Sequence, residues 1–233
     1  MTLNGLTIQN GNGDLGGGIF NNGGALIVNN SSVNGNTGAN TGGIFNLGRL
    51  TLNNSNVNGN GGLYTGGIVN PNGTLTLNKS TVKGNTSSET FDNGDAGGIN
   101  NGGTLTVENS VVEGNTARGR GGAGGILTYG MLTVEDSSVK GNAGGNGDAG
   151  GIRESSFYGP QGVTLINSSV NGNTTTGRGG GIYNDSGNTL TLTNSTVTGN
   201  SAVSGGGIYN LGTLIGAVAG ANVFGNTPDQ IAP

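Results

Sequence analysis

The chain has 233 residues, of which 54 are glycine, 9% are charged and 4% are aromatic, with a net charge of −4 at pH 7. It contains no cysteine and no histidine, which excludes disulfide bonds, thiolate metal sites and the commonest general base of enzymes. Eight Lys and Arg residues against twelve Asp and Glu residues give no basic surface for nucleic acid, and no apolar run approaches the roughly 18 residues of a transmembrane helix.

Three apolar anchors recur along the chain in the same order, which indicates a repeat protein. The first is the last apolar residue of a Leu-Thr-Leu-like run, at Leu3, Val28, Leu52, Leu77, Val107, Val134, Leu165 and Leu192. The second is the valine of V-x-G-N, with Ile8 as a looser first copy before Val33, Val57, Val82, Val112, Val139, Val170, Val197 and Val223. The third is the isoleucine after Gly-Gly, at Ile19, Ile44, Ile68, Ile99, Ile126, Ile152, Ile182 and Ile208.

Apolar and polar residues alternate around each anchor, as in Leu190, Thr191 and Leu192, which is the period-two pattern of a β-strand. Gly and Asn separate these short strands, and both tolerate the positive φ that sharp bends require. Three strands per coil predict an all-β fold, a right-handed single-stranded parallel β-helix of about eight coils. We expect a single domain over residues 1–233, with a degenerate last coil and a short tail from about residue 227.

One corner of the coil has a constant length. The first anchor precedes the second by five residues in every copy, whereas the step from Asn60 to Ile68 is eight residues and that from Asn85 to Ile99 is fourteen. One corner is therefore rigid and two accept insertions. At the rigid corner we expect an inward serine ladder of Ser31, Ser55, Ser80, Ser110, Ser137, Ser168 and Ser195. One residue earlier, an amide ladder of Asn30, Asn54, Asn109, Asn167 and Asn194 can form hydrogen bonds along the axis.

A row of threonines occupies one outward position of the first strand. Its members are Thr2, Thr51, Thr76, Thr106, Thr133, Thr164 and Thr191, interrupted by Ile27. Thr74, Thr104 and Thr189 form a partial second row, which Arg49, Met131 and Gly162 break. Flat threonine arrays are used by ice-binding proteins, and Thr is also simply a good strand residue. Both interpretations stay open for Thr51, Thr76, Thr106, Thr133, Thr164 and Thr191.

Charged residues fall into register as well. Lys83, Glu113 and Lys140 share one position on successive coils, and Asp148 and Arg178 share another. Both sets are expected to be structural charge ladders of alternating sign. Glu108 and Glu135 also share a position, with Asp136 beside one of them. Two carboxylates one coil apart are either solvated surface groups or a weak cation site, and we expect no cofactor and no catalytic set here.

Aromatic residues follow four of the isoleucine anchors, at Phe20, Phe45, Tyr183 and Tyr209. They are candidates for a binding face, and their positions near the two ends of the chain predict two small patches. The glycine runs at 16–18 and 205–207 lack the Lys-Ser/Thr and the helix of a phosphate-binding loop, so we interpret them as turns.

The order V-x-x-N followed by G-G-Ile resembles the F-x-x-N and G-G-A-I repeats of chlamydial polymorphic outer membrane proteins, with Val in place of Phe. The segments 192–197 (Leu-Thr-Asn-Ser-Thr-Val) and 206–210 (Gly-Gly-Ile-Tyr-Asn) are similar to repeats of bacterial secreted or cell-surface β-helix proteins and autotransporter passengers. The resemblance covers nearly the whole chain. It implies a bacterial β-helix that serves in adhesion, display or surface coating.

The sequence therefore favours a non-enzymatic, adhesin-like structural β-helix located outside the cell or on its surface. Its expected partners are a carbohydrate, a host or cell surface, or a second copy of the chain. Three alternatives stay open. They are a fibre subunit that stacks head to tail through uncapped ends, an ice-binding protein that uses the threonine row, and a carbohydrate-active enzyme, which would need clustered carboxylates on one face.

Overall fold

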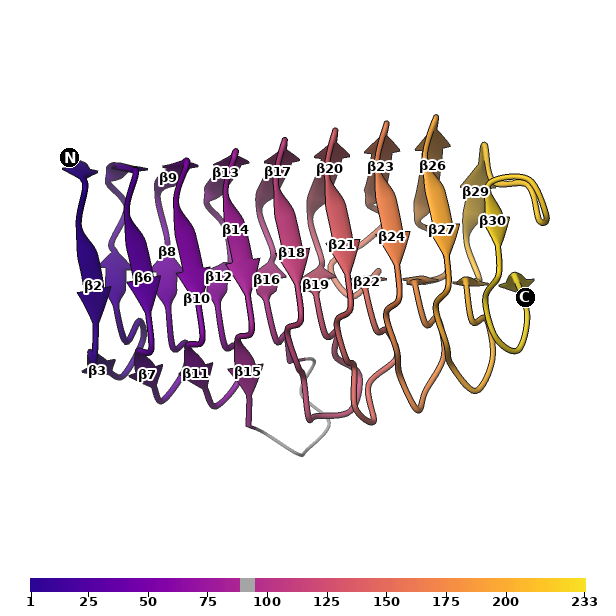
Figure 1. Cartoon of the computed structure of the whole chain (residues 1–233), viewed down its shortest axis with the longest axis horizontal. Coiled ribbons are helices and arrows are strands. Elements are labelled where there is room, and N and C mark those ends of the chain that lie inside the picture. The colour runs from indigo at the N-terminus through magenta and orange to yellow at the C-terminus, as the bar shows by residue number, and fades with distance from the viewer. Residues whose placement is uncertain (89–94) are drawn as a thin grey trace.

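The computed structural model describes residues 1–88 and 95–233, which form a rod of stacked coils (Figure 1). Every pairing between its strands is parallel, and the described residues contain no helix. The predicted fold class, a parallel β-helix, is confirmed. Three sheets of nine strands and one of four strands run along the rod.

The threonine sheet contains the Leu-Thr-Leu strands. These are β1 (Thr2–Asn4), β5 (Ala25–Asn29), β9 (Arg49–Asn53), β13 (Thr74–Asn78), β17 (Thr104–Glu108), β20 (Met131–Glu135), β23 (Gly162–Ile166), β26 (Thr189–Thr193) and β29 (Thr213–Ile215). The valine sheet follows it around each coil. Its strands are β2 (Thr7–Gln9), β6 (Ser32–Asn34), β10 (Asn56–Asn58), β14 (Thr81–Lys83), β18 (Val111–Glu113), β21 (Ser138–Lys140), β24 (Ser169–Asn171), β27 (Thr196–Thr198) and β30 (Val223–Phe224).

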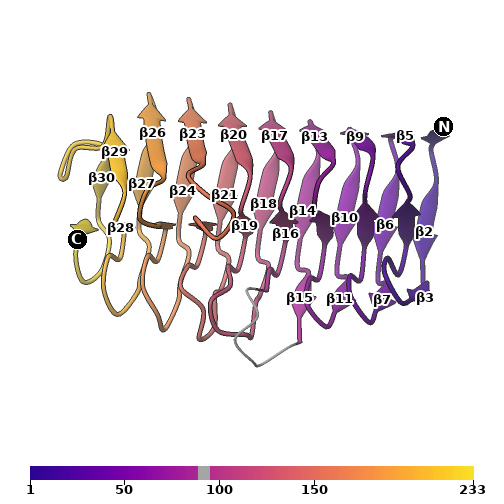
Figure 2. The ribbon, with the colours of Figure 1, turned by 180° about the vertical axis from the view of Figure 1, so that it is seen from behind.

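The isoleucine sheet closes each coil. Its strands are β4 (Ile19–Asn21), β8 (Ile44–Asn46), β12 (Ile68–Asn70), β16 (Ile99–Asn101), β19 (Ile126–Thr128), β22 (Ile152–Glu154), β25 (Ile182–Asn184), β28 (Ile208–Asn210) and β31 (Ile231–Ala232). Before it, the first four coils add a short sheet of two-residue strands. These are β3 (Asn12–Gly13), β7 (Thr37–Gly38), β11 (Gly61–Gly62) and β15 (Thr86–Ser87). Figure 2 shows the same order of coils from behind.

The coil number is nine, not the eight that the sequence pattern predicts, because three sheets have nine strands each. The ninth coil keeps the V-x-G-N signature at residues 223–226 but lacks the other two. Leu214 pairs in register with Leu190, but Gly216 replaces the apolar residue two positions later that is the first anchor of the other coils. Ile231 pairs with Ile208, although it follows Asp229 and Gln230 in place of Gly-Gly. The tail after residue 227 therefore belongs to the last coil.

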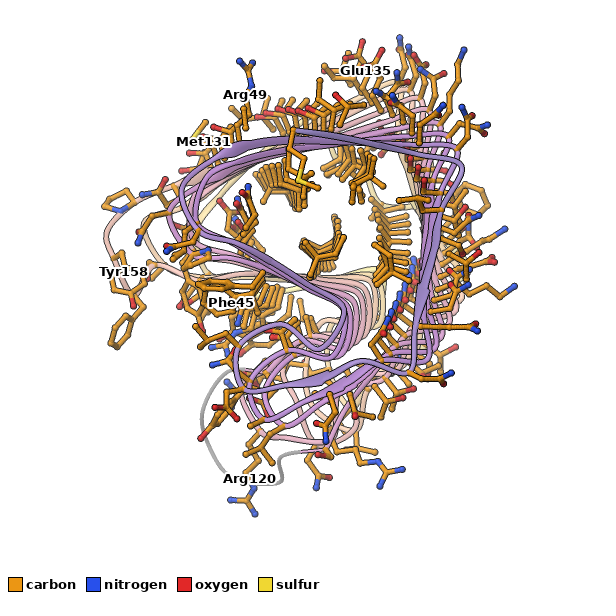
Figure 3. All side chains as sticks on the ribbon, turned by 90° about the vertical axis from the view of Figure 1, so that its left-hand side faces the viewer. Phe45, Arg49, Arg120, Met131, Glu135 and Tyr158 are labelled. Carbon is orange, nitrogen blue, oxygen red and sulfur yellow. The ribbon has the colours of Figure 1, made fainter. Side chains whose placement is uncertain are left out.

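The core is a set of like residues stacked in register along the axis, visible end-on in Figure 3. Leu75 pairs with Leu105, and Val57 pairs with Val82. These four side chains are at most 1% exposed. Burying one such side chain contributes about 1.5–3 kcal/mol, so the repeated anchors supply the main driving force for folding.

The serine ladder at the rigid corner is confirmed. All seven serines are buried, and the backbone N–H of each of the first six donates to the hydroxyl of the next, as from Ser55 to Ser80 at 3.1 Å. The residue before each serine has positive φ, for example 47° at Asn54. The amide ladder at that position is exposed and discontinuous, since Lys79 and Asp136 interrupt it. Asn54 donates to Asn30 at 2.7 Å.

A buried asparagine ladder, which the sequence analysis used only as a spacing marker, lines the next corner. It consists of Asn36, Asn60, Asn85, Asn115, Asn142, Asn173, Asn200 and Asn226. The backbone N–H and the Nδ2 of Asn85 both donate to Oδ1 of Asn115, each at 2.9 Å. The same Nδ2 donates to the carbonyl of Val57 at 2.9 Å. Each interior amide therefore satisfies buried groups on both neighbouring coils.

The two ends of the rod differ. At the C-terminal end Gln230 takes the place of a further asparagine, since its Oε1 accepts from the N–H and the Nδ2 of Asn226 at 3.1 and 3.0 Å. Ala217, in the loop after β29, also packs against the core. At the N-terminal end β1, β2 and β4 each pair with one neighbour, on the second coil. Within the described residues, no helix is long and apolar enough to cross a membrane.

Candidate functional site: a groove beside the isoleucine sheet

The outward face of the isoleucine sheet carries apolar side chains that pack into a second cluster of buried residues. Leu127 points outward from β19 yet is fully buried, in a cluster with Ala96, Ala123 and Ala149 from the bends that precede this sheet. Alanine is small enough for these bends to lie close over the sheet. This cluster is separate from the main core and lies outside the coil.

An insertion between β22 and β23 adds two aromatic residues beside this face. Phe157 is 78% exposed and Tyr158 is 71% exposed. The ring centres of Phe157 and Tyr158 are 5.0 Å apart. Tyr129 follows β19 on the preceding coil, and its ring centre lies 6.4 Å from that of Phe157 and 5.6 Å from that of Tyr158. All three pairs have edge-to-face geometry, which aromatic rings prefer. We call Tyr129, Phe157 and Tyr158 the aromatic wall.

The aromatic wall borders a groove of about 1080 Å³ that extends along several coils. Phe45 and Tyr64 line the same groove, and Figure 3 shows Phe45 and Tyr158 on one side of the rod. Its polar lining comes from Asn40, Thr65, Asn72, Asn100, Arg153, Ser155 and Gln161. Among the described residues, the groove thus combines aromatic rings with neutral hydrogen-bonding groups and a single charged side chain.

Arg153 lines the groove and contacts two side chains of neighbouring segments. Its guanidinium lies 3.4 Å from the Asp148 carboxylate and 5.5 Å from the ring centre of Tyr183. Asp148 therefore balances part of the charge of Arg153. Burial raises the pKa of the Tyr129 hydroxyl, and this group therefore stays protonated and able to donate a hydrogen bond.

Two further aromatic pairs lie on the isoleucine sheet, and Phe45 of the first pair also lines the groove. Phe20 and Phe45 meet edge-to-face at 5.8 Å, and Tyr183 and Tyr209 stack at 5.3 Å. These are the two small patches that the sequence predicts. Arg178 lies 5.2 Å from the ring centre of Tyr209.

The predicted charge ladders have different outcomes. Lys83 and Lys140 both pair with Glu113, at 2.8 and 3.3 Å, as expected. The pairing of Asp148 with Arg178 is wrong, because Asp148 instead contacts Arg153. The side chain of Arg178 covers Tyr209, where the contact with the ring replaces an ion pair.

The predicted threonine row lies in register on the threonine sheet. Thr51 pairs with Thr76, which pairs with Thr106, and Thr133, Thr164 and Thr191 continue the row on the next three coils. Ile27 precedes it, and Met131, labelled in Figure 3, projects from the same sheet. The row is half-buried among its own neighbours.

The weak cation site is not supported. Glu108 and Glu135 are register partners, but they do not form a cation site with Asp136, because the described residues contain no group of three acidic side chains that could hold a metal ion. Asp136 occupies the positive-φ corner and accepts a hydrogen bond from Asn167 at 3.2 Å. Its role is therefore part of the corner ladder.

Four aromatic residues of the groove, Tyr64, Tyr129, Phe157 and Tyr158, were not predicted from the sequence. The sequence does contain one sign of the aromatic wall, because the step from Ile152 to Leu165 is longer than in other coils and contains two adjacent aromatic residues. Such a pair stands out in a chain with only five tyrosines and five phenylalanines. No protein-family model, curated protein sequence or solved structure matches the chain.

Proposed function

We propose that this protein is a non-enzymatic, adhesin-like β-helix of the cell surface or exterior that binds a carbohydrate chain in the groove beside the isoleucine sheet. The observation that carries the proposal is the aromatic wall. Phe157 and Tyr158 remain mostly exposed at the edge of a groove, and exposed apolar clusters of this kind mark interaction sites.

The chemistry of the lining favours a sugar as the ligand. Aromatic rings offer flat apolar faces to the C–H faces of a pyranose, while amides and hydroxyls exchange hydrogen bonds with its hydroxyl groups. In the part of the chain that the structure describes, the lining includes one charged residue, Arg153, which already contacts Asp148. We therefore propose a neutral glycan rather than a uronate-rich one.

The groove lends itself to binding more than to hydrolysis. Glycoside hydrolysis generally uses two carboxyl groups on either side of the scissile bond. Among the described residues that line the groove, the polar side chains are amides, hydroxyls and Arg153. The nearby carboxyl of Glu154 is fully buried within the coil.

The proposal is tested by a screen of neutral and acidic glycans, followed by calorimetric titration of the best ligand into the wild type and the variants Phe157→Ala and Tyr158→Ala. Each variant is expected to weaken binding about tenfold, which corresponds to about 1.4 kcal/mol. Phe224→Ala is the matched control, because Phe224 is an exposed phenylalanine on the valine sheet. Equal affinities of all four proteins, or failure to bind any glycan, would reject the proposal.

A second candidate is ice binding through the threonine sheet. It is favoured by one observation, the unbroken register of threonines from Thr51 to Thr191 on six successive coils. The variant Thr106→Lys would disrupt this row at its centre. Ice recrystallisation inhibition by the wild type at micromolar concentration, lost in this variant, would support this candidate, and no inhibition by the wild type would end it.

A further inference from the structure

Glu154 occupies an unusual position in the interior. It ends β22, directly before the insertion that carries Phe157 and Tyr158. In the isoleucine sheet the corresponding residue is usually an asparagine, and these asparagines form a second amide ladder, in which Asn46 donates to Asn70 and Asn184 donates to Asn210, both at 2.7 Å. Glu154 is the register partner of Asn184.

The side chain of Glu154 lacks the partners that an ionised carboxylate needs. It is fully buried, and neither carboxyl oxygen has a hydrogen-bond partner among the described residues. On the preceding coil Thr128 uses its hydroxyl proton to bond the carbonyl of Gly130 at 2.9 Å. Thr128 therefore has no proton left to donate to Glu154.

The next coil has the complementary deficiency. Oδ1 of Asn184 is buried and lacks a donor. Each asparagine that precedes another asparagine in this ladder fills the corresponding gap with its own Nδ2–H. An ionised glutamate offers only acceptors, whereas a neutral carboxylic acid has one O–H to donate. One proton on Glu154 would therefore supply the donor that Oδ1 of Asn184 lacks and would remove the charge of a carboxylate that has no donors of its own.

The surrounding charges act in the same direction. Burial raises the pKa of Glu154 to about 8, and the Asp185 carboxylate adds to this effect, while the nearby backbone N–H of Val163 opposes it without reaching the geometry of a hydrogen bond. From β19 the facing residue is the neutral Thr128, and from β25 it is the neutral Asn184. Arg153 extends to the outer face, where it contacts Asp148.

The groups that hold Glu154 also hold the insertion. The backbone N–H of Asp185 donates to the carbonyl of Glu154 at 3.1 Å, and that of Ser155 donates to the carbonyl of Thr128 at 2.9 Å. At the far end of the insertion, the N–H of Gln161 donates to Oδ1 of Asn188 at 2.9 Å. An extra negative charge at Glu154 would repel Asp185 at the base of the aromatic wall.

We propose that Glu154 is a neutral, protonated positioning residue that donates a hydrogen bond to Asn184 and so fixes the insertion with the aromatic wall. Loss of its proton to solvent loosens the insertion and weakens ligand binding. The second step rests on the proposed function, because it assumes that the aromatic wall binds the glycan. The first step concerns the fold alone.

The absence of histidine and cysteine from the sequence leaves a pH window in which few side chains titrate. A group whose pKa is higher in the folded protein than in the unfolded chain stabilises the fold at low pH, and this stability is lost as the pH rises through the folded pKa. Between pH 5.5 and 8.5 the melting temperature of the wild type is expected to fall by several degrees. The variant Glu154→Gln keeps a donor to Asn184 and carries no titrating group, so its melting temperature is expected to stay nearly constant.

Three proteins are compared across this range: the wild type, Glu154→Gln, and Glu108→Gln as the matched control on the threonine sheet. Melting temperature, hydrogen exchange of residues 155–161 corrected for its intrinsic pH dependence, and glycan affinity are measured for each. In the wild type and the control, exchange is expected to rise and affinity to fall about tenfold toward pH 8.5, and neither changes in Glu154→Gln. Infrared difference spectra of the wild type against Glu154→Gln at pH 6 should contain a protonated carboxyl band, a readout that does not depend on the stability of the variant.

Parallel pH profiles of the wild type and Glu154→Gln, or the absence of the protonated band, would overturn the assignment of Glu154. A pH-dependent melting temperature and exchange without glycan binding at any pH would uphold the neutral Glu154 and reject the proposed function. Glycan binding that is independent of pH, together with the expected exchange, would reject the link between Glu154 and the ligand.

Discussion

The ring centre of Tyr158 lies 5.6 Å from the ring centre of Tyr129 on the preceding coil, so the insertion on one coil contacts the coil before it. Edge-to-face pairs contribute about 0.5–1.5 kcal/mol beyond the area that they bury. We expect Tyr129→Ala and Tyr158→Ala to weaken glycan binding by less in combination than the sum of their separate effects. A double-mutant cycle by calorimetry measures this coupling, and strictly additive effects would show that the two rings act independently.

The buried asparagine ladder predicts a large effect from a single substitution. In Asn85→Ala, the backbone N–H and the Nδ2 of Asn60 lose their common acceptor. Leaving one buried polar group unpaired costs about 1–3 kcal/mol, so we expect a loss of about 3 kcal/mol or more in the free energy of unfolding. Urea denaturation measures it. The control is Asn56→Ala on the exposed surface of β10, with an expected change within about 0.5 kcal/mol; equal losses in the two variants would contradict the role of the ladder.

The charge ladder of the valine sheet predicts a small, salt-sensitive contribution. The hydrogen bond from Lys83 lowers the pKa of Glu113, with Lys140 also contributing. The stabilisation is therefore present above the pKa of an unfolded glutamate and is lost as the pH falls through the lower, folded pKa. Because the side chains of Lys83 and Lys140 are 59% and 45% exposed, each pair contributes at most about 1 kcal/mol.

Reversal of the central charge tests this contribution. Glu113→Lys is expected to lower the melting temperature at pH 7, since it places three lysines on successive coils. Its difference from the wild type should shrink at 1 M salt, where the Debye length is about 3 Å, and also below the folded pKa of Glu113. An unchanged melting temperature at low salt would eliminate the structural role of this ladder.

Gln230 is predicted to close the C-terminal end of the rod. In Gln230→Ala, Asn226 loses the acceptor for its N–H and its Nδ2, and the last coil should fray before the rest of the chain unfolds. Hydrogen exchange is expected to accelerate at β30 and β31 and to stay unchanged at β12 and β16. Gln9→Ala on β2 is the control, because Gln9 is exposed at the opposite end. Acceleration along the whole rod would mean that Gln230 stabilises the protein globally.

The regular part of this structure could be predicted from the sequence, because each coil repeats the same physical solution. Leu77 and Val82 are five residues apart, and the corresponding anchors of the other coils have the same spacing. This constant spacing determines the strands, their register and the inward position of the serines. The coil count was one short, because the last coil has Leu214-Ile215-Gly216 in place of a Leu-Thr-Leu run and Asp229-Gln230 in place of Gly-Gly before Ile231.

The irregular part could not be predicted in this way. Tyr129 and Tyr158 lie in connections of variable length, where the repeat gives no register. Their contact depends on how the insertion after β22 folds back on the preceding coil. The predicted partner of Asp148, Arg178, was wrong for the same reason. Both residues lie four positions before an isoleucine anchor, but this shared distance does not bring two side chains together when the bends between coils differ in length.

The five tyrosines of the chain allow the most direct measurement of the proposed site. Tyr64, Tyr129 and Tyr158 line the groove, whereas Tyr183 and Tyr209 stack on each other outside its lining. Titration of the glycan into protein with isotope-labelled tyrosine rings, followed by NMR, should shift the resonances of the first three and leave those of the stacked pair in place. Shifts confined to Tyr183 and Tyr209, or no shift of any ring at a saturating concentration of glycan, would contradict the assignment of the groove as the binding site.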